Sequence, residues 1–225
     1  MLAMLQENIG TILTVVVFWV AVFVAWTDRA RVGLRNIWQV IGLCCVYYAL
    51  TMGSTALFVQ MERAMIGVSA AGIFGVFFIT APVLLLILRL RKLNVAAHFD
   101  LFAQTSLVNM FAQRLICCFI GCCGGVELFS TGMDWPVREI ELICDVVLFL
   151  VFLRIRNQNK LPGQMFPLLM IWFSAYRFVI EWFRHARVLG FGLHLAHIWG
   201  MIGLIIGLSI YTELRARANK TAGMA

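Results

Sequence analysis

The chain has 225 residues, of which 62% are hydrophobic and only 13% are charged. A soluble domain carries about 25% charged residues, so water cannot be the solvent for most of this surface. A transmembrane helix needs roughly 20 mostly apolar residues, which leaves room for roughly six to eight spans and no separate soluble domain. The formal net charge of +7 does not indicate nucleic acid here, because the cations lie mainly between apolar runs, where membrane topology explains them.

Apolar runs follow one another along the chain, separated by short polar connectors. They cover residues 9–26, 37–59, 66–88, 101–120, 140–153, 164–183 and 193–212. The fourth and fifth runs are the least apolar. We therefore expect an all-α, polytopic membrane protein of about seven transmembrane helices, forming one domain over residues 1–225.

Basic residues follow the first, third, fifth and seventh runs, and this asymmetry predicts an orientation. These connectors hold 12 of the 18 Lys and Arg residues: Arg29, Arg31, Arg35, Arg89, Arg91, Lys92, Arg154, Arg156, Lys160, Arg215, Arg217 and Lys220. The positive-inside rule places these connectors in the cytoplasm. The N-terminus then faces outward and the C-terminus faces the cytoplasm.

The remaining six cations lie on the outward side or at membrane depth. They are Arg63, Arg114, Arg138, Arg177, Arg184 and Arg187. A charge at the centre of a bilayer costs about 2.5–3.5 kcal/mol, so such side chains usually face the protein interior or a wet cavity. Guanidinium groups bind phosphate through two parallel hydrogen bonds, so this set favours an anionic ligand at the outer leaflet.

Two stretches carry most of these arginines. In 176–184, Arg177, Glu181 and Arg184 are spaced to lie on one helix face, either as an ion ladder between helices or as an anion site. In 114–125, Arg114 precedes a run rich in Gly and Cys that allows close approach of the backbone, either to a ligand or to another helix. The adjacent thiols in this run lack the spacing of a zinc site, but they leave a weak redox alternative open.

The connector at 134–141 enters the fifth run. Pro136 is placed to start a helix, and Glu139 complements the helix dipole in the first turn. Glu141 lies deeper and is expected to face the cavity, with Asp145 one turn further on.

Two other runs carry polar residues that bear on the site. The fourth run begins with His98 and Asp100 and is too polar to face lipid all round. His194 and His197, near the start of the seventh run, are expected to be interfacial or hydrogen-bonded rather than catalytic.

In their order and spacing, these residues resemble the bacterial prolipoprotein diacylglyceryl transferase family over roughly residues 60–205. The resemblance rests on the family's Arg-Ile-Gly…Asn-Gly-x-x-x-Gly stretch, on an Asp fourteen residues before its Arg, on a Pro-x-x-x-Tyr-Glu turn, on a Pro-Gly pair and on an Arg-Phe-x-x-Glu-Phe-x-Arg helix. The matching positions are Arg114, Gly121, Gly125, Asp100, Pro136, Glu141, Pro162, Gly163, Arg177, Phe178, Glu181, Trp182 and Arg184.

The sequence departs from the family at several positions. Ala71 stands where the family has a His, and Phe173 stands where it has a Tyr. The Gly and Asn of the Arg-Ile-Gly-Asn stretch are replaced by Ile116 and Cys117, and Ile140 replaces the Tyr of the turn. The missing His and Tyr bear directly on how a thiol would be activated.

The resemblance implies an enzyme of the bacterial cytoplasmic (inner) membrane that needs no cofactor and no metal. Its expected partners are phosphatidylglycerol, prolipoprotein signal peptides and the lipid bilayer, and it would transfer diacylglycerol to the lipobox cysteine thiol. The resemblance implies Arg114, Arg177 and Glu181 as catalytic residues. It implies Arg184, Glu141, Gly121, Gly125 and Asp100 as substrate-binding residues.

Within that reading, Arg114 and Arg177 hold the phosphate, Glu181 orients Arg177 and Glu141 positions the head group. Deprotonation of the thiol relies either on the arginine-rich field, which stabilises the thiolate, or on Asp100. Asp100 has a second interpretation as a structural residue, because fourteen helical residues place it about 21 Å from Arg114. Two other functions stay open: a non-catalytic lipid-binding or partner-binding relative, and a membrane thiol oxidoreductase that uses the paired cysteines.

Overall fold

A computed structural model describes residues 2–67, 72–121, 124–127, 133–158, 161–184, 188–190 and 192–222. The α-helices of this part are α1 (Leu2–Thr27), α2 (Ile37–Ile66), α3 (Ala81–Leu90), α4 (Val95–Ile120), α5 (Val137–Gln158), α6 (Met165–Ile180) and α7 (Leu195–Ala222). A π-helical turn, η1 (Val76–Thr80), leads into α3, and a 3₁₀ turn, η2 (Glu181–Phe183), follows α6. The strands β1 (Val188–Gly190) and β2 (Leu193–His194) form a small antiparallel pair before α7.

Each of these helices overlaps one of the apolar runs, although α2 continues to Ile66 and η1 with α3 begins at Val76, ten residues after the predicted start of the third run. Local signals set several of the ends. Asn36 caps α2 in a capping box with Gln39, and Asn94 caps α4 by accepting a hydrogen bond from the backbone N–H of Ala97. α4 ends at Gly121, whose φ of 75° is the left-handed conformation that glycine adopts without strain.

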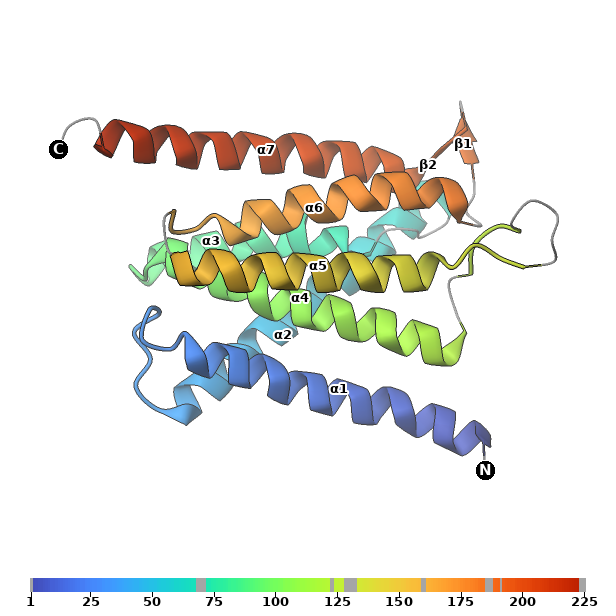
Figure 1. The fold of residues 1–225 in the computed structure, drawn as a ribbon, viewed down its shortest axis with the longest axis horizontal. Coiled ribbons are helices and arrows are strands. Elements are labelled where there is room, and N and C mark those ends of the chain that lie inside the picture. Colours follow the sequence, from blue (N-terminus) through green and yellow to red (C-terminus); the bar gives the residue numbers. More distant parts are fainter. Residues whose placement is uncertain are drawn as a thin grey trace.

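The helices run roughly along one common direction, and the two chain ends lie at opposite ends of the bundle (Figure 1). α4 packs against α1, α5 and α6, and nearly all of its residues from Leu101 to Met110 are buried. The sequence prediction that this polar helix does not face lipid all round is therefore confirmed. α6 packs along α7, and both turn at their shared end into η2 and the β1–β2 pair.

In the part of the chain that the structure describes, four helical segments are long and apolar enough to cross a membrane: Gly10–Thr27, Ile37–Ile66, Met165–Phe183 and Leu195–Lys220. Many large apolar side chains on these helices are exposed, such as Phe23, Leu57 and Ile205, as expected for a surface in contact with lipid. α4 and α5 fall outside this set because their sequences contain the polar residues described below. They are also the two runs that are least apolar in sequence.

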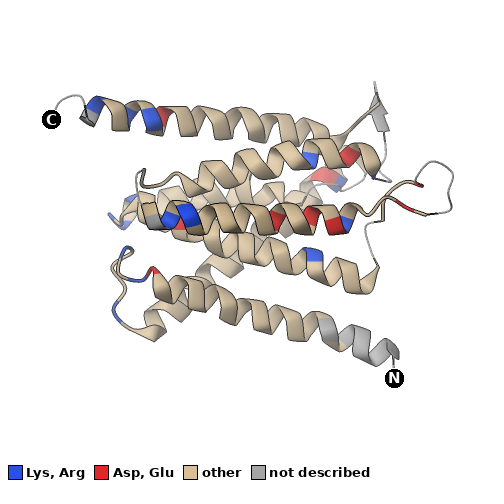
Figure 2. Cartoon of the chain, viewed as in Figure 1, with Lys and Arg blue, Asp and Glu red and all other residues tan. Residues whose placement is uncertain are grey.

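The charged residues gather at the two ends of the bundle, and the middle is almost free of them (Figure 2). One end carries mostly Lys and Arg, from the connector after α1, the end of α3, the end of α5 and the end of α7. The opposite end carries arginines and acidic residues together, on α4, α5 and α6. That mixed end holds Arg114, Arg177 and Arg184, three of the arginines that the topology pattern does not explain.

Candidate functional site

Three arginines converge on one buried carboxylate, that of Glu141 in α5. Arg177 Nη1 lies 2.8 Å from Glu141 Oε1, Arg184 Nη2 lies 2.8 Å from Oε2, and Arg114 Nη1 lies 3.0 Å from the same Oε2. Glu141 is 0% exposed, and the side chain of Arg177 is 4% exposed. Residues from α4, α5, α6 and the segment after α6 thus form one polar cluster at the mixed end of the bundle.

A second carboxylate, Glu181, extends the cluster toward α7. Its Oε2 lies 3.0 Å from Arg177 Nη2, an i,i+4 contact that continues from α6 into η2. Its Oε1 lies 3.9 Å from Nδ1 of His194 in β2. Arg177 therefore contacts both glutamates, and three arginines outnumber the two glutamates that contact them.

The end of α6 differs from the sequence prediction. The spacing predicts Arg177, Glu181 and Arg184 on one continuous helix face, but α6 ends at Ile180 and Arg184 has extended backbone angles, φ −105° and ψ 147°. Arg184 reaches Glu141 because its backbone leaves the helix and forms an isolated β-bridge with Gly125. Of the three residues, only Arg177 and Glu181 keep their helical relation.

Gly125 makes that bridge possible. A Cβ at this position would lie 2.5 Å from the backbone oxygen of Trp135 and 2.9 Å from that of Phe183. The next residue, Val126, donates its N–H to Phe183 O at 2.9 Å and accepts one from Trp135 at 2.9 Å. At Gly125, the close backbone approach expected in 114–125 is therefore to the backbone of Trp135 and Phe183, not to a ligand. It holds the connector against the segment that carries Arg184. Gly121 ends α4 seven residues after Arg114.

The six unexplained cations separate into groups. Arg114, Arg177 and Arg184 form the cluster. Arg138 lies 3.8 Å from its neighbour Glu139, Arg63 is exposed at the end of α2, and Arg187 lies outside the described residues. Three of the six arginines singled out by the cost of charge at membrane depth thus form the cluster. The other two that the structure describes, Arg63 and Arg138, lie at helix ends.

An apolar groove lies one turn deeper along α5. It has a volume of about 240 Å³ and is lined by Val20, Leu107, Val108, Phe111, Asp145, Val146 and Phe149. Asp145 is 1% exposed and is the one acidic residue in this lining. Its Oδ1 accepts a hydrogen bond from the hydroxyl of Tyr176 at 3.0 Å, and its Oδ2 has no hydrogen-bond partner among the described residues. Because Asp145 lies one turn of α5 from Glu141, the groove and the arginine cluster are neighbours along that helix.

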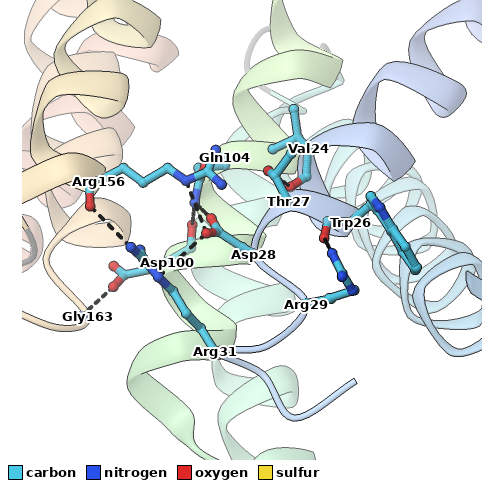
Figure 3. A network of polar contacts seen from close by, with 10 residues as sticks. All are labelled: Val24, Trp26, Thr27, Asp28, Arg29, Arg31, Asp100, Gln104, Arg156 and Gly163. Carbon is cyan, nitrogen blue, oxygen red and sulfur yellow. Dashed lines mark hydrogen bonds and ion pairs between the residues drawn. The ribbon is translucent and has the colours of Figure 1, made fainter. Parts of the chain in front are cut away.

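Asp100 lies at the opposite end of the bundle, in a separate polar network (Figure 3). Its two carboxylate oxygens accept the backbone N–H groups of Gly163 at 2.7 Å and Met165 at 2.9 Å, at the start of α6. Nearby, Asp28 pairs with Arg156 at 3.0 Å and accepts a hydrogen bond from Gln104 at 2.9 Å. The structure therefore does not bring Asp100 together with the arginine cluster.

Some sequence predictions fall on residues that the structure does not describe. Ala71, which stands at the position of the family's His, lies outside the described residues, as do Cys122 and Cys123. Cys117 and Cys118 are described and lie half-buried near the end of α4. The contact of His194 with Glu181 was missed in the sequence, because only the return of the chain through β1 and β2 brings the two residues together.

The fold and the site define a polytopic α-helical membrane protein with a buried arginine–glutamate site at one end of its bundle. The family model of prolipoprotein diacylglyceryl transferase matches residues 7–212, and the chain belongs to this family. The chain is also similar to a phosphatidylglycerol–prolipoprotein diacylglyceryl transferase of Campylobacter hominis, at 27% identity over 168 residues. That alignment covers 66% of this chain and 58% of the relative's length.

Proposed function

We propose that this protein transfers a diacylglyceryl group from phosphatidylglycerol to the lipobox cysteine of prolipoproteins. The observation that carries the proposal is the convergence of Arg114, Arg177 and Arg184 on the single buried Glu141. Only two carboxylates contact the three arginines, and this excess of guanidinium donors favours an anion as a further ligand. Membership of the family and the similar transferase of Campylobacter hominis support the choice of phosphatidylglycerol as that anion.

In this proposal, the phosphate of phosphatidylglycerol binds to the outer faces of the arginines. A guanidinium has five N–H donors, and the contacts with Glu141 and Glu181 use only some of them. Arg184 Nε is buried and has no hydrogen-bond partner among the described residues, which supports a role as a donor to ligand. Glu141 holds the guanidinium groups at fixed positions, and Glu181 orients Arg177. Gly121 and Gly125 keep the connector close to the bound head group.

The reaction is a displacement at carbon. The lipobox thiol loses its proton, since the thiolate is the nucleophile. Its sulfur attacks the diacylglyceryl carbon that carries the phosphate ester, so that an S–C bond forms and the C–O bond breaks. The electron pair of that bond leaves with glycerol phosphate, whose second negative charge develops beside Arg114 and Arg177. Donors fixed in advance around a developing charge lower the barrier.

The proposed setting is the outer leaflet of a bacterial cytoplasmic membrane, with all seven helices spanning it. The mixed end of the bundle then faces outward, and the Lys- and Arg-rich end faces the cytoplasm. The apolar groove beside Asp145 suits an acyl chain of the lipid whose phosphate occupies the arginine cluster. Asp100 is not part of this site in the proposal, and it instead anchors the start of α6.

The test is to incubate the purified protein with phosphatidylglycerol and a lipobox peptide and to read the peptide mass. We expect a diacylglyceryl adduct with the wild-type protein, and loss of the adduct in Arg177→Ala and in Arg177→Lys, since lysine cannot contact both glutamates. Arg217→Ala is the matched control, because Arg217 is an exposed arginine paired with Glu213 on α7. It should leave the yield of adduct unchanged.

The same assay separates the other functions. A protein that binds phosphatidylglycerol vesicles in an Arg177-dependent way but forms no adduct would be a non-catalytic lipid-binding relative. A thiol oxidoreductase would lose its function when the two pairs of adjacent cysteines, Cys117–Cys118 and Cys122–Cys123, are replaced by serine. The transferase uses the thiol of the peptide, so this quadruple variant should still form the adduct.

A further inference from the structure

His194 occupies a position in the cluster that the proposed function leaves unused. It is 7% exposed, and its Nδ1 lies 3.9 Å from Oε1 of Glu181, the carboxylate that also contacts Arg177. Nδ1 has no hydrogen-bond partner among the described residues. The carboxylate of Glu181 thus lies between the imidazole of His194 and the guanidinium of Arg177.

Its neighbour His197 has a different environment. The backbone N–H of His194 donates to Nδ1 of His197 at 2.9 Å, so this nitrogen must present a lone pair. A protonated His197 would lose that bond, and its ring also packs against Phe178 and Trp182, with ring centroids 5.0 and 4.6 Å apart. His197 is therefore held neutral as a cap of the chain turn, and His194 is the member of the pair that is able to accept a proton.

The arrangement of Glu181 and His194 has the elements of a general base. With Nδ1 carrying its proton toward the carboxylate, Nε2 keeps a lone pair, and the carboxylate stabilises the imidazolium that forms. The distance of 3.9 Å between Nδ1 and Oε1 is longer than a hydrogen bond, as is common for catalytic contacts in the absence of substrate. The charged and titratable described groups that face His194 are Glu181, Arg177 behind it, and His197.

We propose that His194 accepts the proton of the lipobox thiol and so takes the place of the family's His, where this chain has Ala71. This inference rests on the proposed function. The thiol proton moves to Nε2 of His194, and the thiolate sulfur displaces glycerol phosphate from the diacylglyceryl carbon. The proton then passes to the departing phosphate monoester or to water, which restores neutral His194. Glu181 couples the two halves of the reaction, because it contacts both the base and the phosphate-binding Arg177.

Among the described residues, two other titratable groups, His98 and Asp100, lie at the far end of the bundle, whereas Asp145 lies beside the arginine cluster, in the apolar groove, with its Oδ1 bonded to Tyr176. His98 bonds the backbone oxygen of Asn94 at 2.8 Å, at the same end as Asp100. Asp100 itself accepts two backbone N–H groups there. Both lie on the early part of α4, whereas Arg114 lies near its end, so neither reaches the arginine cluster.

The experiment is the pH dependence of kcat/KM for diacylglyceryl transfer to a lipobox peptide, measured for the wild-type protein, His194→Gln and His194→Ala. His194→Gln should lose about 100-fold near pH 7, the usual contribution of a general base. It should recover as the pH approaches about 8.5, where the peptide thiol ionises without help. KM for phosphatidylglycerol should not change.

Chemical rescue and a matched control complete the test. Free imidazole should restore transfer by His194→Ala, and His98→Gln should behave as the wild-type protein. A loss in His194→Gln that is the same at every pH and is not rescued would overturn the proposal and make His194 a structural contact. Full activity of His194→Gln would overturn it as well. Failure of the proposed function looks different, since the wild-type protein would then form no adduct at any pH, and this outcome would overturn both proposals.

Discussion

Glu141 is the residue on which the geometry of the site depends. It is fully buried and contacts three guanidinium groups that come from three different segments. Its charge offsets part of theirs, so removing it leaves uncompensated buried cations. Losing one partner of a buried ion pair costs about 3–5 kcal/mol, more than the intact pair contributes to stability.

We expect Glu141→Gln to lower the free energy of unfolding by about 3–5 kcal/mol, because the amide keeps the shape but loses the charge. The measurement is thermal unfolding in detergent, with Glu213→Gln as control. Glu213 forms an exposed i,i+4 pair with Arg217, so its replacement should leave Tm nearly unchanged. A phosphatidylglycerol analogue that raises the Tm of Glu141→Gln more than that of the wild-type protein would show that the arginines accept an anion in place of the carboxylate. Equal Tm values for the wild-type protein and Glu141→Gln would contradict the central role of Glu141.

A second prediction concerns the closest backbone contact near the site. Gly125→Ala should break the bridge to Arg184, because the added Cβ would lie 2.5 Å from the oxygen of Trp135. We expect at least a tenfold loss of transfer, roughly 1.4 kcal/mol, together with a lower Tm. Gly42→Ala is the control, since a Cβ there meets nothing within 4 Å. Normal transfer by Gly125→Ala would show that Arg184 reaches Glu141 without the bridge.

At the scale of elements, the helix ends place the reactive groups. α6 stops at Ile180, one residue before Glu181, and the change to 3₁₀ and then extended backbone turns Arg184 back toward α5. At the other end of α6, the carboxylate of Asp100 on α4 holds the start of the helix by accepting the backbone N–H groups of Gly163 and Met165. The length and tilt of α6 between these two anchors fix the height of Arg177 in the bundle.

Asp100→Asn should therefore act on stability rather than on substrate binding. The amide keeps one acceptor oxygen and loses the other, so one buried N–H at the start of α6 loses its partner. The expected cost is about 1.5–3 kcal/mol, the range for hydrogen bonds to charged groups. Thermal unfolding and KM for phosphatidylglycerol should be measured together, with the exposed Asp134→Asn as control. A raised KM with an unchanged Tm would instead support a substrate-binding role for Asp100.

At the scale of the whole molecule, the sequence predicts the helices well and the site in part. Each α-helix of the described residues overlaps one of the apolar runs, and four of these helices are long and apolar enough to cross a membrane. Arg114, Arg177 and Arg184 stand out because charge at membrane depth is costly. The extended backbone at Arg184 and the contact of His194 with Glu181 are tertiary features with no local pattern in the sequence. The polar residues that make α4 and α5 weak in hydropathy are the ones that form the buried networks, such as Gln104 and Asp145.

The orientation of the bundle is the prediction on which the location of the proposed reaction depends, because the arginine cluster must face the leaflet where secreted peptides emerge. We expect the connector between α4 and α5 to face outward and the end of α7 to face the cytoplasm. Met133 and Ala216 are exposed in these two places, so a cysteine at either would be accessible to a reagent on its own side.

The measurement is labelling of intact spheroplasts with a membrane-impermeant maleimide, in a variant whose seven cysteines are replaced by alanine. Met133→Cys should be labelled in intact spheroplasts, and Ala216→Cys only after the membrane is permeabilised. A fluorescent protein fused to the C-terminus, which fluoresces when it folds in the cytoplasm, tests the same point without altering the cysteines. The reverse labelling pattern would place the arginine cluster in the inner leaflet. Lipobox thiols would then not meet it after translocation, and both the proposed reaction and the role of His194 would fail on topology alone.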